Sequence, residues 1–200
     1  MSGVQIPPPL PVNPGSYFRA EWGIMDKAIF AGGCFWCTEA VFLQLKGVYK
    51  VVSGYIGGNI TSPTYEMICS GRTGHVEAIE VNFKSSEISY KTLLEVFFNT
   101  HDPTQSNGQG NDIGSQYLSM IFFNSDNQKD EANAYMDSIA DNFESPIVTK
   151  LYTTKEFYPA EDYHQNYYNL NKTQPYCEVA INPKMSKFRE NYKHLLKINS

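Results

Sequence analysis

Cysteine is scarce in this sequence, with four residues in 200, which is too few for a fold held together by disulfides. An excess of basic residues is also absent: the net charge of −5 provides no positive field to attract nucleic acid or anionic lipid. No apolar run is long enough to cross a bilayer, and no basic segment leads into a short apolar one. We therefore expect a cytoplasmic protein without membrane or nucleic-acid partners, in which each thiol needs its own interpretation.

Internal repeats are lacking as well, and a length of 200 residues favours one domain. Residues 1–24 are rich in proline and have no hydrophobic periodicity, so they predict a flexible N-terminal arm or leader. We expect residues 25–200 to form a single catalytic domain, and the protein to be a monomer.

Short apolar stretches alternate with longer amphipathic ones along the rest of the chain. Strands are predicted at 27–33, 48–55, 79–83, 118–123 and 149–153. Helices are predicted at 35–45, 63–69, 89–99, 126–142, 160–170 and 184–198. This order predicts an α+β domain in which a mixed sheet carries helices on its faces. The polar stretch 101–115 predicts a long loop, and such loops in compact domains are usually functional or disordered.

Cys34 lies where the first predicted strand meets the first predicted helix. At a helix N-terminus, free N–H groups and the positive end of the helix dipole favour a thiolate over a thiol. Gly33 allows a second molecule to approach the backbone, and Phe35 and Trp36 provide an apolar wall beside the sulfur. A buried, inert cysteine is the alternative, but the turn, the rings and a second cysteine at Cys37 together favour a nucleophile.

The Cys34-Phe-Trp-Cys37 spacing has two further interpretations. Zinc would require a second pair of ligands at short spacing, whereas Cys69 and Cys177 are isolated and the four histidines form no pair, so we expect no metal. A general thiol–disulfide oxidoreductase also has Cys-x-x-Cys at the start of a helix, and local spacing does not exclude it.

Six motifs occur in order between about 27 and 189. They are Gly33-Cys-Phe-Trp, Pro63-Thr-Tyr-Glu, Cys69-Ser-Gly-Arg-Thr-Gly-His-Val-Glu, His101-Asp-Pro-Thr, Gln109-Gly-Asn-Asp-Ile-Gly-Ser-Gln-Tyr and Ala160-Glu-Asp-Tyr-His-Gln. Together they resemble the A class of peptide methionine sulfoxide reductases. The resemblance implies a two-layer, ferredoxin-like core with extra loops.

The resemblance also implies a role for each matching residue. Cys34 would attack the sulfoxide sulfur, and Glu77 would give a proton to the sulfoxide oxygen, since a carboxyl group beside apolar rings has a raised pKa. Tyr65 and Tyr117 would donate hydrogen bonds to that oxygen as charge develops on it. From the residues alone, Glu77 would be a solvated surface residue and both tyrosines would be core residues.

The remaining implied roles concern substrate binding and the second thiol. Phe35 and Trp36 match the cradle for the methionine methyl group, and Asp112 matches an aspartate that orders the site. The sulfenic acid left on Cys34 can condense with a second thiol. Cys177 is predicted as this resolving cysteine from its position, and Cys37, one helical turn from Cys34, is the alternative.

The predicted activity is thus reduction of the S epimer of methionine sulfoxide, free or in peptides, as a protein repair reaction. No metal or organic cofactor is expected, and thioredoxin would supply the electrons by thiol–disulfide exchange. Two alternatives remain: a general dithiol oxidoreductase, which would reduce insulin and ignore Glu77, and a domain that only binds methionine-rich partners. His164, on the predicted aromatic helix, is assigned no catalytic step.

Overall fold

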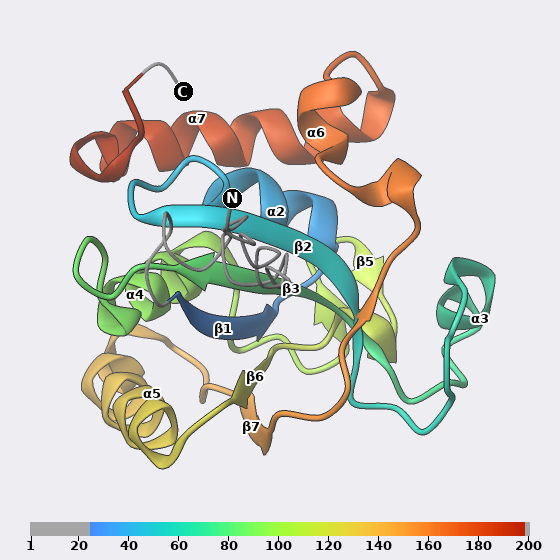
Figure 1. The fold of residues 1–200 in the computed structure, drawn as a ribbon, viewed down its shortest axis with the longest axis horizontal. Coiled ribbons are helices and arrows are strands. Elements are labelled where there is room, and N and C mark those ends of the chain that lie inside the picture. Colours follow the sequence, from blue (N-terminus) through green and yellow to red (C-terminus); the bar gives the residue numbers. More distant parts are fainter. Residues whose placement is uncertain (1–24, 199–200) are drawn as a thin grey trace, which may run out of the picture.

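The computed structural model describes residues 25–198 and contains a six-stranded sheet with the order β7-β6-β1-β3-β2-β8 (Figure 1). The strands are β1 (Asp26–Ala31), β2 (Val48–Ile56), β3 (Val76–Phe83), β6 (Met120–Phe123), β7 (Lys150–Thr153) and β8 (Tyr158–Pro159). Strands β6 and β7 pair in parallel, and all other neighbours in this sheet pair antiparallel. The predicted α+β class with a mixed sheet is confirmed. The predicted arm, residues 1–24, lies outside the described residues, and the division into an arm and one domain stays a prediction.

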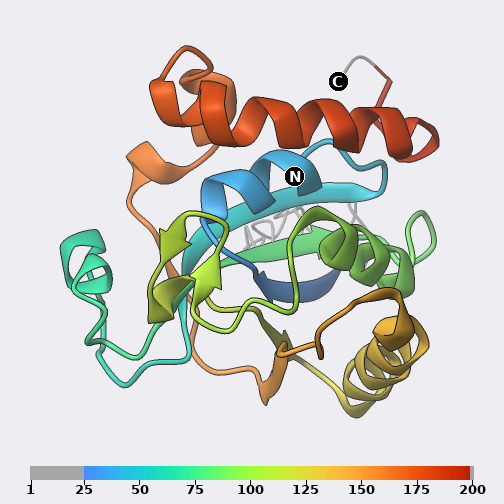
Figure 2. The same cartoon turned by 180° about the vertical axis from the view of Figure 1, so that it is seen from behind.

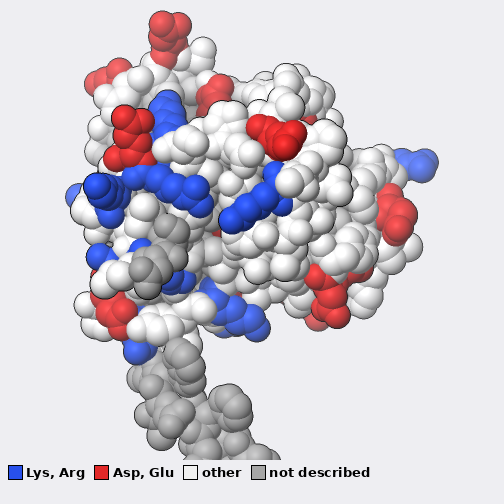
Figure 3. Space-filling model, turned by 90° about the horizontal axis from the view of Figure 1, so that it is seen from above, with Lys and Arg blue, Asp and Glu red and all other residues white. Residues whose placement is uncertain are grey.

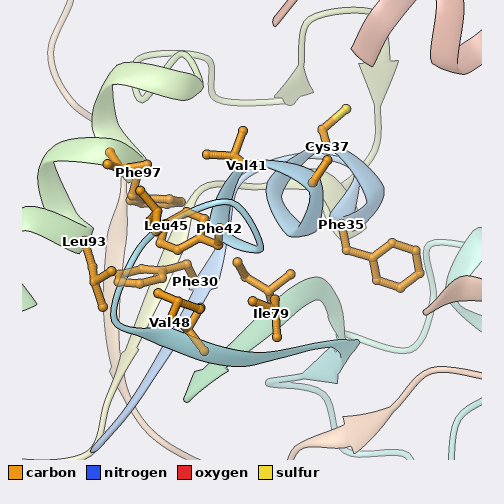
Figure 4. Packing of buried hydrophobic residues seen from close by; sticks show 14 of the residues in the cluster. Phe30, Phe35, Cys37, Val41, Phe42, Leu45, Val48, Ile79, Leu93 and Phe97 are labelled. Atoms are coloured by element: carbon orange, nitrogen blue, oxygen red, sulfur yellow. The ribbon is translucent and has the colours of Figure 1, made fainter. Parts of the chain in front are cut away.

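The alternation of side chains along β1 explains how the sheet buries both of its faces. Ala28 and Phe30 belong to the larger apolar cluster, whereas Ile29 and Ala31 belong to a smaller cluster on the opposite face. This is the two-residue period of a strand that is covered on both sides. Phe30 pairs in register with Ile79 of β3, so the central strands contribute to one continuous core (Figure 4).

The helices gather mainly on the face of the larger cluster. They are α2 (Phe35–Phe42), α3 (Tyr65–Cys69), α4 (Tyr90–Thr100), α5 (Asp126–Ile139), α6 (Tyr167–Leu170) and α7 (Asn182–Asn191). Helix α2 lies between the sheet and α7 (Figures 1 and 2). Every residue of α2 except Trp36 is buried, so its N-terminal end is held rigidly from both sides.

The predicted helix over 160–170 is wrong in its extent. The structure has a 3₁₀ turn at Asp162–His164, a left-handed Asn166 with φ of 52°, and only then the short α6. The cause is a long-range contact: the buried Glu39 carboxylate accepts the backbone N–H of Asn166 at 2.8 Å and of Tyr167 at 3.2 Å. These N–H groups therefore do not bond to carbonyls within a helix.

The predicted loop over 101–115 folds into a small hairpin of β4 (Gly108–Gln109) and β5 (Asp112–Ile113). Figure 2 shows this hairpin on the same side of the molecule as α4, with both below α7. Gln109 ties the hairpin to the chain, because its side chain accepts from the Asp102 N–H at 3.1 Å and donates to the Asp102 carbonyl at 2.9 Å. The loop is thus ordered by its own amide groups.

The surface agrees with the modest net charge. On the face that carries α6 and α7, basic and acidic side chains are interspersed (Figure 3). None of the helices within residues 25–198 has the length and apolarity needed to cross a membrane.

Candidate active site

Cys34 lies in the turn from β1 into α2, as the residue that caps the helix N-terminus. The preceding Gly33 has φ of +85°, in the left-handed region, and a Cβ there would fall 2.6 Å from the Gln109 side chain. Glycine is therefore required for both the turn and the close approach of the hairpin. The Gly33 N–H also donates to the Tyr117 carbonyl at 3.2 Å, which joins this turn to the 3₁₀ segment Ser115–Tyr117.

Cys34 and Cys37 form a buried thiol pair in the first turn of α2. The Cys37 N–H donates to the Cys34 carbonyl at 3.1 Å. The adjacent Cys34 thiol lowers the pKa of Cys37 to about 7, assisted by the Lys184 ammonium. The pair thus loses its first proton near neutrality and shares the resulting negative charge.

The structure differs from the expectation that the helix N-terminus leaves Cys34 as a thiolate. Cys34 is only 8% exposed, and burial, followed by the Cys37 and Glu77 side chains, raises its pKa well above the ordinary value. Loss of water around a thiolate outweighs the helix dipole here. Cys34 becomes the better nucleophile when the negative charges beside it are removed, above all when Glu77 carries a proton.

Glu77 lies on β3 with its carboxyl group directed at the start of α2. It is 2% exposed, and its Oε2 accepts the Phe35 N–H at 3.0 Å. Burial raises the pKa of Glu77 to about 8, and the Asp112 and Cys37 charges act in the same direction. The solvated surface interpretation therefore does not apply, because the group is a buried acid that holds its proton at neutral pH.

Tyr65 and Tyr117 lie close enough to Glu77 for its charge to act on both phenols. Burial raises the pKa of both phenols, and Glu77 contributes to each shift, as Cys34 does for Tyr117. Both hydroxyls thus remain neutral donors throughout the physiological pH range. Tyr65 is held at the start of α3 by its N–H, which donates to the Glu161 carboxylate at 2.9 Å.

Trp36 is fixed by two aromatic neighbours that the sequence interpretation did not assign to the site. Its indole stacks on Tyr167 with a centroid distance of 3.7 Å and an angle of 8° between the rings. Its Nε1–H donates to Nδ1 of the buried His164 at 3.1 Å. His164 must therefore be neutral with its hydrogen on Nε2, and it has a defined task in orienting Trp36. Phe35 lies beside Trp36, with ring centroids 6.3 Å apart.

Asp112 reaches the thiol pair through a residue that sequence reasoning also missed. The Tyr176 hydroxyl donates to Asp112 at 2.7 Å and lies 3.8 Å from the Cys37 sulfur. The Tyr176 ring meets Trp36 edge-on, with centroids 5.7 Å apart. The position of Tyr176, directly before the predicted resolving cysteine, was the only signal for it in the sequence.

Cys177 follows Tyr176 at the start of a π-helical turn, Cys177–Ile181, that leads into α7. Its side chain is fully buried, and burial raises the pKa of its thiol. Cys69, at the end of α3, is exposed. All four cysteines are free.

A cavity of about 460 Å³ opens beside the thiol pair. Its wall includes Cys34, Cys37, Gln109, Asp112 and Tyr176. Of the predicted site residues, Cys34, Cys37 and Asp112 line this cavity, whereas Glu77, Tyr65, Tyr117, Phe35, Trp36 and Cys177 do not. Within residues 25–198, no three His, Cys, Asp or Glu side chains are grouped so as to hold a metal ion.

Comparison with known proteins identifies relatives of this chain. The family model described as "Peptide methionine sulfoxide reductase" matches residues 26–196. The peptide methionine sulfoxide reductase MsrA of Acinetobacter baumannii (strain AYE) is 51% identical over 173 residues, which are 86% of this chain and 99% of the relative.

Solved structures agree with the sequence relatives. Methionine sulfoxide reductase A of Corynebacterium diphtheriae is 31% identical, with a TM-score of 0.69 over 78% of this chain and 79% of its own. Reduced Mxr1 of Saccharomyces cerevisiae is 30% identical, with a TM-score of 0.71 over 76% of this chain and 89% of its own. Mxr1 has also been solved in complex with Trx2.

Proposed function

Since this chain belongs to the peptide methionine sulfoxide reductase family of oxidoreductases, we propose that Cys34 is the nucleophile with which it reduces the S epimer of methionine sulfoxide. The observation that carries this proposal is the buried Glu77 carboxyl group, which accepts the N–H of Phe35, the residue after Cys34, and whose burial favours the protonated form. Thiolate attack on a sulfoxide needs both a nucleophilic sulfur and an acid for the oxygen. The substrate is methionine sulfoxide in peptides or as the free amino acid, so the enzyme serves protein repair.

The reaction begins with the thiolate of Cys34 attacking the sulfoxide sulfur. Glu77 transfers its proton toward the oxygen, and Tyr65 and Tyr117 donate hydrogen bonds to it as negative charge develops. The oxygen then passes to the Cys34 sulfur. The methionine sulfur gains two electrons, and Cys34 loses two and becomes a sulfenic acid.

The aromatic residues and Asp112 support this step without taking part in proton transfer. Trp36, oriented by Tyr167 and His164, and the adjacent Phe35 form the apolar surface for the methyl group of the substrate. Asp112 holds the Tyr176 hydroxyl next to the thiol pair and so orders the mouth of the site. No metal or organic cofactor enters these steps.

For the resolving step, the geometry favours Cys37 over Cys177. Cys37 lies one helical turn from Cys34, with its N–H bonded to the Cys34 carbonyl at 3.1 Å, and its pKa of about 7 supplies a thiolate at neutral pH. Its attack on the sulfenic acid forms a Cys34–Cys37 disulfide and releases water. Cys177 is fully buried in the π-helical turn, and burial raises the pKa of its thiol, so it supplies less thiolate than Cys37 does.

Replacement of each cysteine distinguishes these two assignments. In Cys37→Ser, reduced enzyme should form one equivalent of methionine, lose one thiol and accumulate a sulfenic acid that dimedone traps, without further turnover. Cys177→Ser should still lose two thiols and turn over with a dithiol reductant. Mass spectrometry of the digested protein locates the disulfide, and Cys69→Ser is the matched control. A two-thiol loss in Cys37→Ser with sulfenic acid accumulation in Cys177→Ser would assign resolution to Cys177 instead.

Recycling is proposed to come from thioredoxin, whose dithiol would exchange with the enzyme disulfide. This assignment is supported by the similarity to Mxr1, which was solved with Trx2. The test is NADPH consumption with thioredoxin and thioredoxin reductase, using separate S and R epimers of an N-acetylated methionine sulfoxide. We expect turnover of the S epimer alone and negligible reduction of insulin by the enzyme itself. Insulin reduction without sulfoxide reduction would favour a general dithiol oxidoreductase.

A further inference from the structure

A second cavity, of about 410 Å³, adjoins the cavity that contains the thiol pair. The two cavities share Gln109 and Lys184 in their walls. The second cavity lies between α7 and the C-terminal end of α4. Figure 2 shows both helices on the same side of the molecule as the β4–β5 hairpin. A chain leaving the thiol pair in this direction would pass directly into it.

The α7 side of this second cavity is one regular helix face. The residues that line it recur at intervals of one, three and four: Pro183, Lys184, Lys187, Phe188, Asn191 and Tyr192. Phe188 and Tyr192 are buried and stacked with ring centroids 5.4 Å apart, so they form an apolar floor. Lys187 is exposed and Lys184 is half-buried.

The charge in this cavity has one sign. Neither Lys184 nor Lys187 forms an ion pair with any residue in the described range 25–198, and no Asp or Glu lines the cavity. The Lys184 charge acts on both Cys37 and His101, which places it between the two cavities. His101 adds no charge near neutrality, because burial lowers its pKa to about 4.

The opposite wall is the C-terminal end of α4, where free carbonyls disfavour anions. Side chains donate to three carbonyls of α4, and one of them, that of Phe97, is among the last four carbonyls, which lack a partner within the helix. Asn99 donates to the Glu95 carbonyl at 2.8 Å, Thr100 to the Val96 carbonyl at 2.8 Å, and His101 to the Phe97 carbonyl at 2.7 Å. Among the described residues, Lys184 and Lys187 are therefore the only charged side chains that line this cavity, while the Glu95 carboxylate lies beside Tyr192 and Asp112 lines the adjoining cavity.

We propose that the cavity between α4 and α7 binds the polypeptide that flanks the sulfoxide, and that Lys184 and Lys187 favour acidic side chains in that flank. Its volume lies within the range of ligand sites, roughly 300–1,000 Å³. This inference rests on the proposed function, since it assigns to the same site a preferred class of substrate. It goes further by predicting which oxidised proteins are repaired fastest: those with a carboxylate close to the methionine.

The test uses pre-reduced enzyme in single turnover, so that recycling does not enter. The second-order rate constant is measured for sulfoxide peptides with Asp or with Lys placed before or after the methionine. The wild type should prefer the Asp peptide by about fivefold on at least one side, less at high salt. Lys187→Glu should remove or reverse this preference. Lys50→Glu is the matched control, because Lys50 is exposed on β2, lines neither cavity and carries the same charge.

The outcomes separate this inference from the proposed function. Reduction of N-acetylmethionine sulfoxide by the wild type tests the reductase alone. Equal rates for all peptides in an active wild type would overturn the inference and leave the function intact. So would a preference that Lys187→Glu and Lys50→Glu change equally, since it would reflect only the overall charge.

Discussion

Cys34→Ser is expected to form no methionine from methionine sulfoxide, even in a single turnover. A serine hydroxyl at this position has no neighbour that deprotonates it, and oxygen is a poor acceptor for the sulfoxide oxygen. Loss of the nucleophile should lower the rate by roughly 10⁴-fold or more. The measurement is quantification of methionine after mixing excess enzyme with a sulfoxide peptide, without added reductant.

The control for this variant is a measurement that shows that its fold is unchanged. Cys34 and serine are similar in size, and the site is supported by the buried α2, so the circular dichroism spectrum and thermal midpoint should change little. Cys37→Ser, treated identically, should still yield one equivalent. Stoichiometric methionine from Cys34→Ser would contradict the assignment, because another thiol would then have to attack.

Glu77→Gln is expected to slow the first turnover by about 10²- to 10⁴-fold, the usual contribution of a positioned general acid. Glutamine can still accept the Phe35 N–H, so the start of α2 should be preserved, but it has no proton to give. The control is Glu80→Gln, which changes a glutamate on the same strand that is paired with Lys27 at the surface. Comparable losses in both variants would argue against a specific role for Glu77.

The pH dependence of the single-turnover rate is an independent test of the role of Glu77. The protonated form of Glu77 is the active acid, and its pKa is about 8, so the acid is fully available below that pH and is lost as pH rises through it. Above the pKa of about 7 at which the thiol pair loses its first proton, the single-turnover rate of the wild type should therefore fall as pH rises through about 8. Glu77→Gln should lack this decline, and a decline that persists unchanged in the variant would assign it to another group.

Local pattern predicted most of the sheet and the helices around it. The alternation of Ile79, Val81 and Phe83 with polar residues indicates a strand, and β3 contains these residues. The helix predicted over 160–170 failed because Glu39, more than a hundred positions earlier, takes the N–H groups of Asn166 and Tyr167. Nothing within that segment reports on a buried carboxylate elsewhere in the chain.

In the candidate site, too, some features could be predicted from the sequence, and others depend on long-range contacts. The family resemblance predicted that Cys34 and Glu77 lie in one site, and the Glu77 carboxyl group accepts the N–H of Phe35, the residue after Cys34. Their proton affinities depend on burial, which spacing does not encode, so the raised pKa of Cys34 was not foreseen. The support of Trp36 by His164 and of Asp112 by Tyr176 joins residues 128 and 64 positions apart, and only the folded chain brings them together.

The central claim is tested most directly by stoichiometric reduction of a methionine sulfoxide peptide with no reductant present. Pre-reduced enzyme is mixed separately with the S and the R epimer, and methionine and free thiols are counted together. We expect one methionine per enzyme from the S epimer with the loss of two thiols, and none from the R epimer. No methionine from either epimer, or methionine from the R epimer alone, would contradict the account.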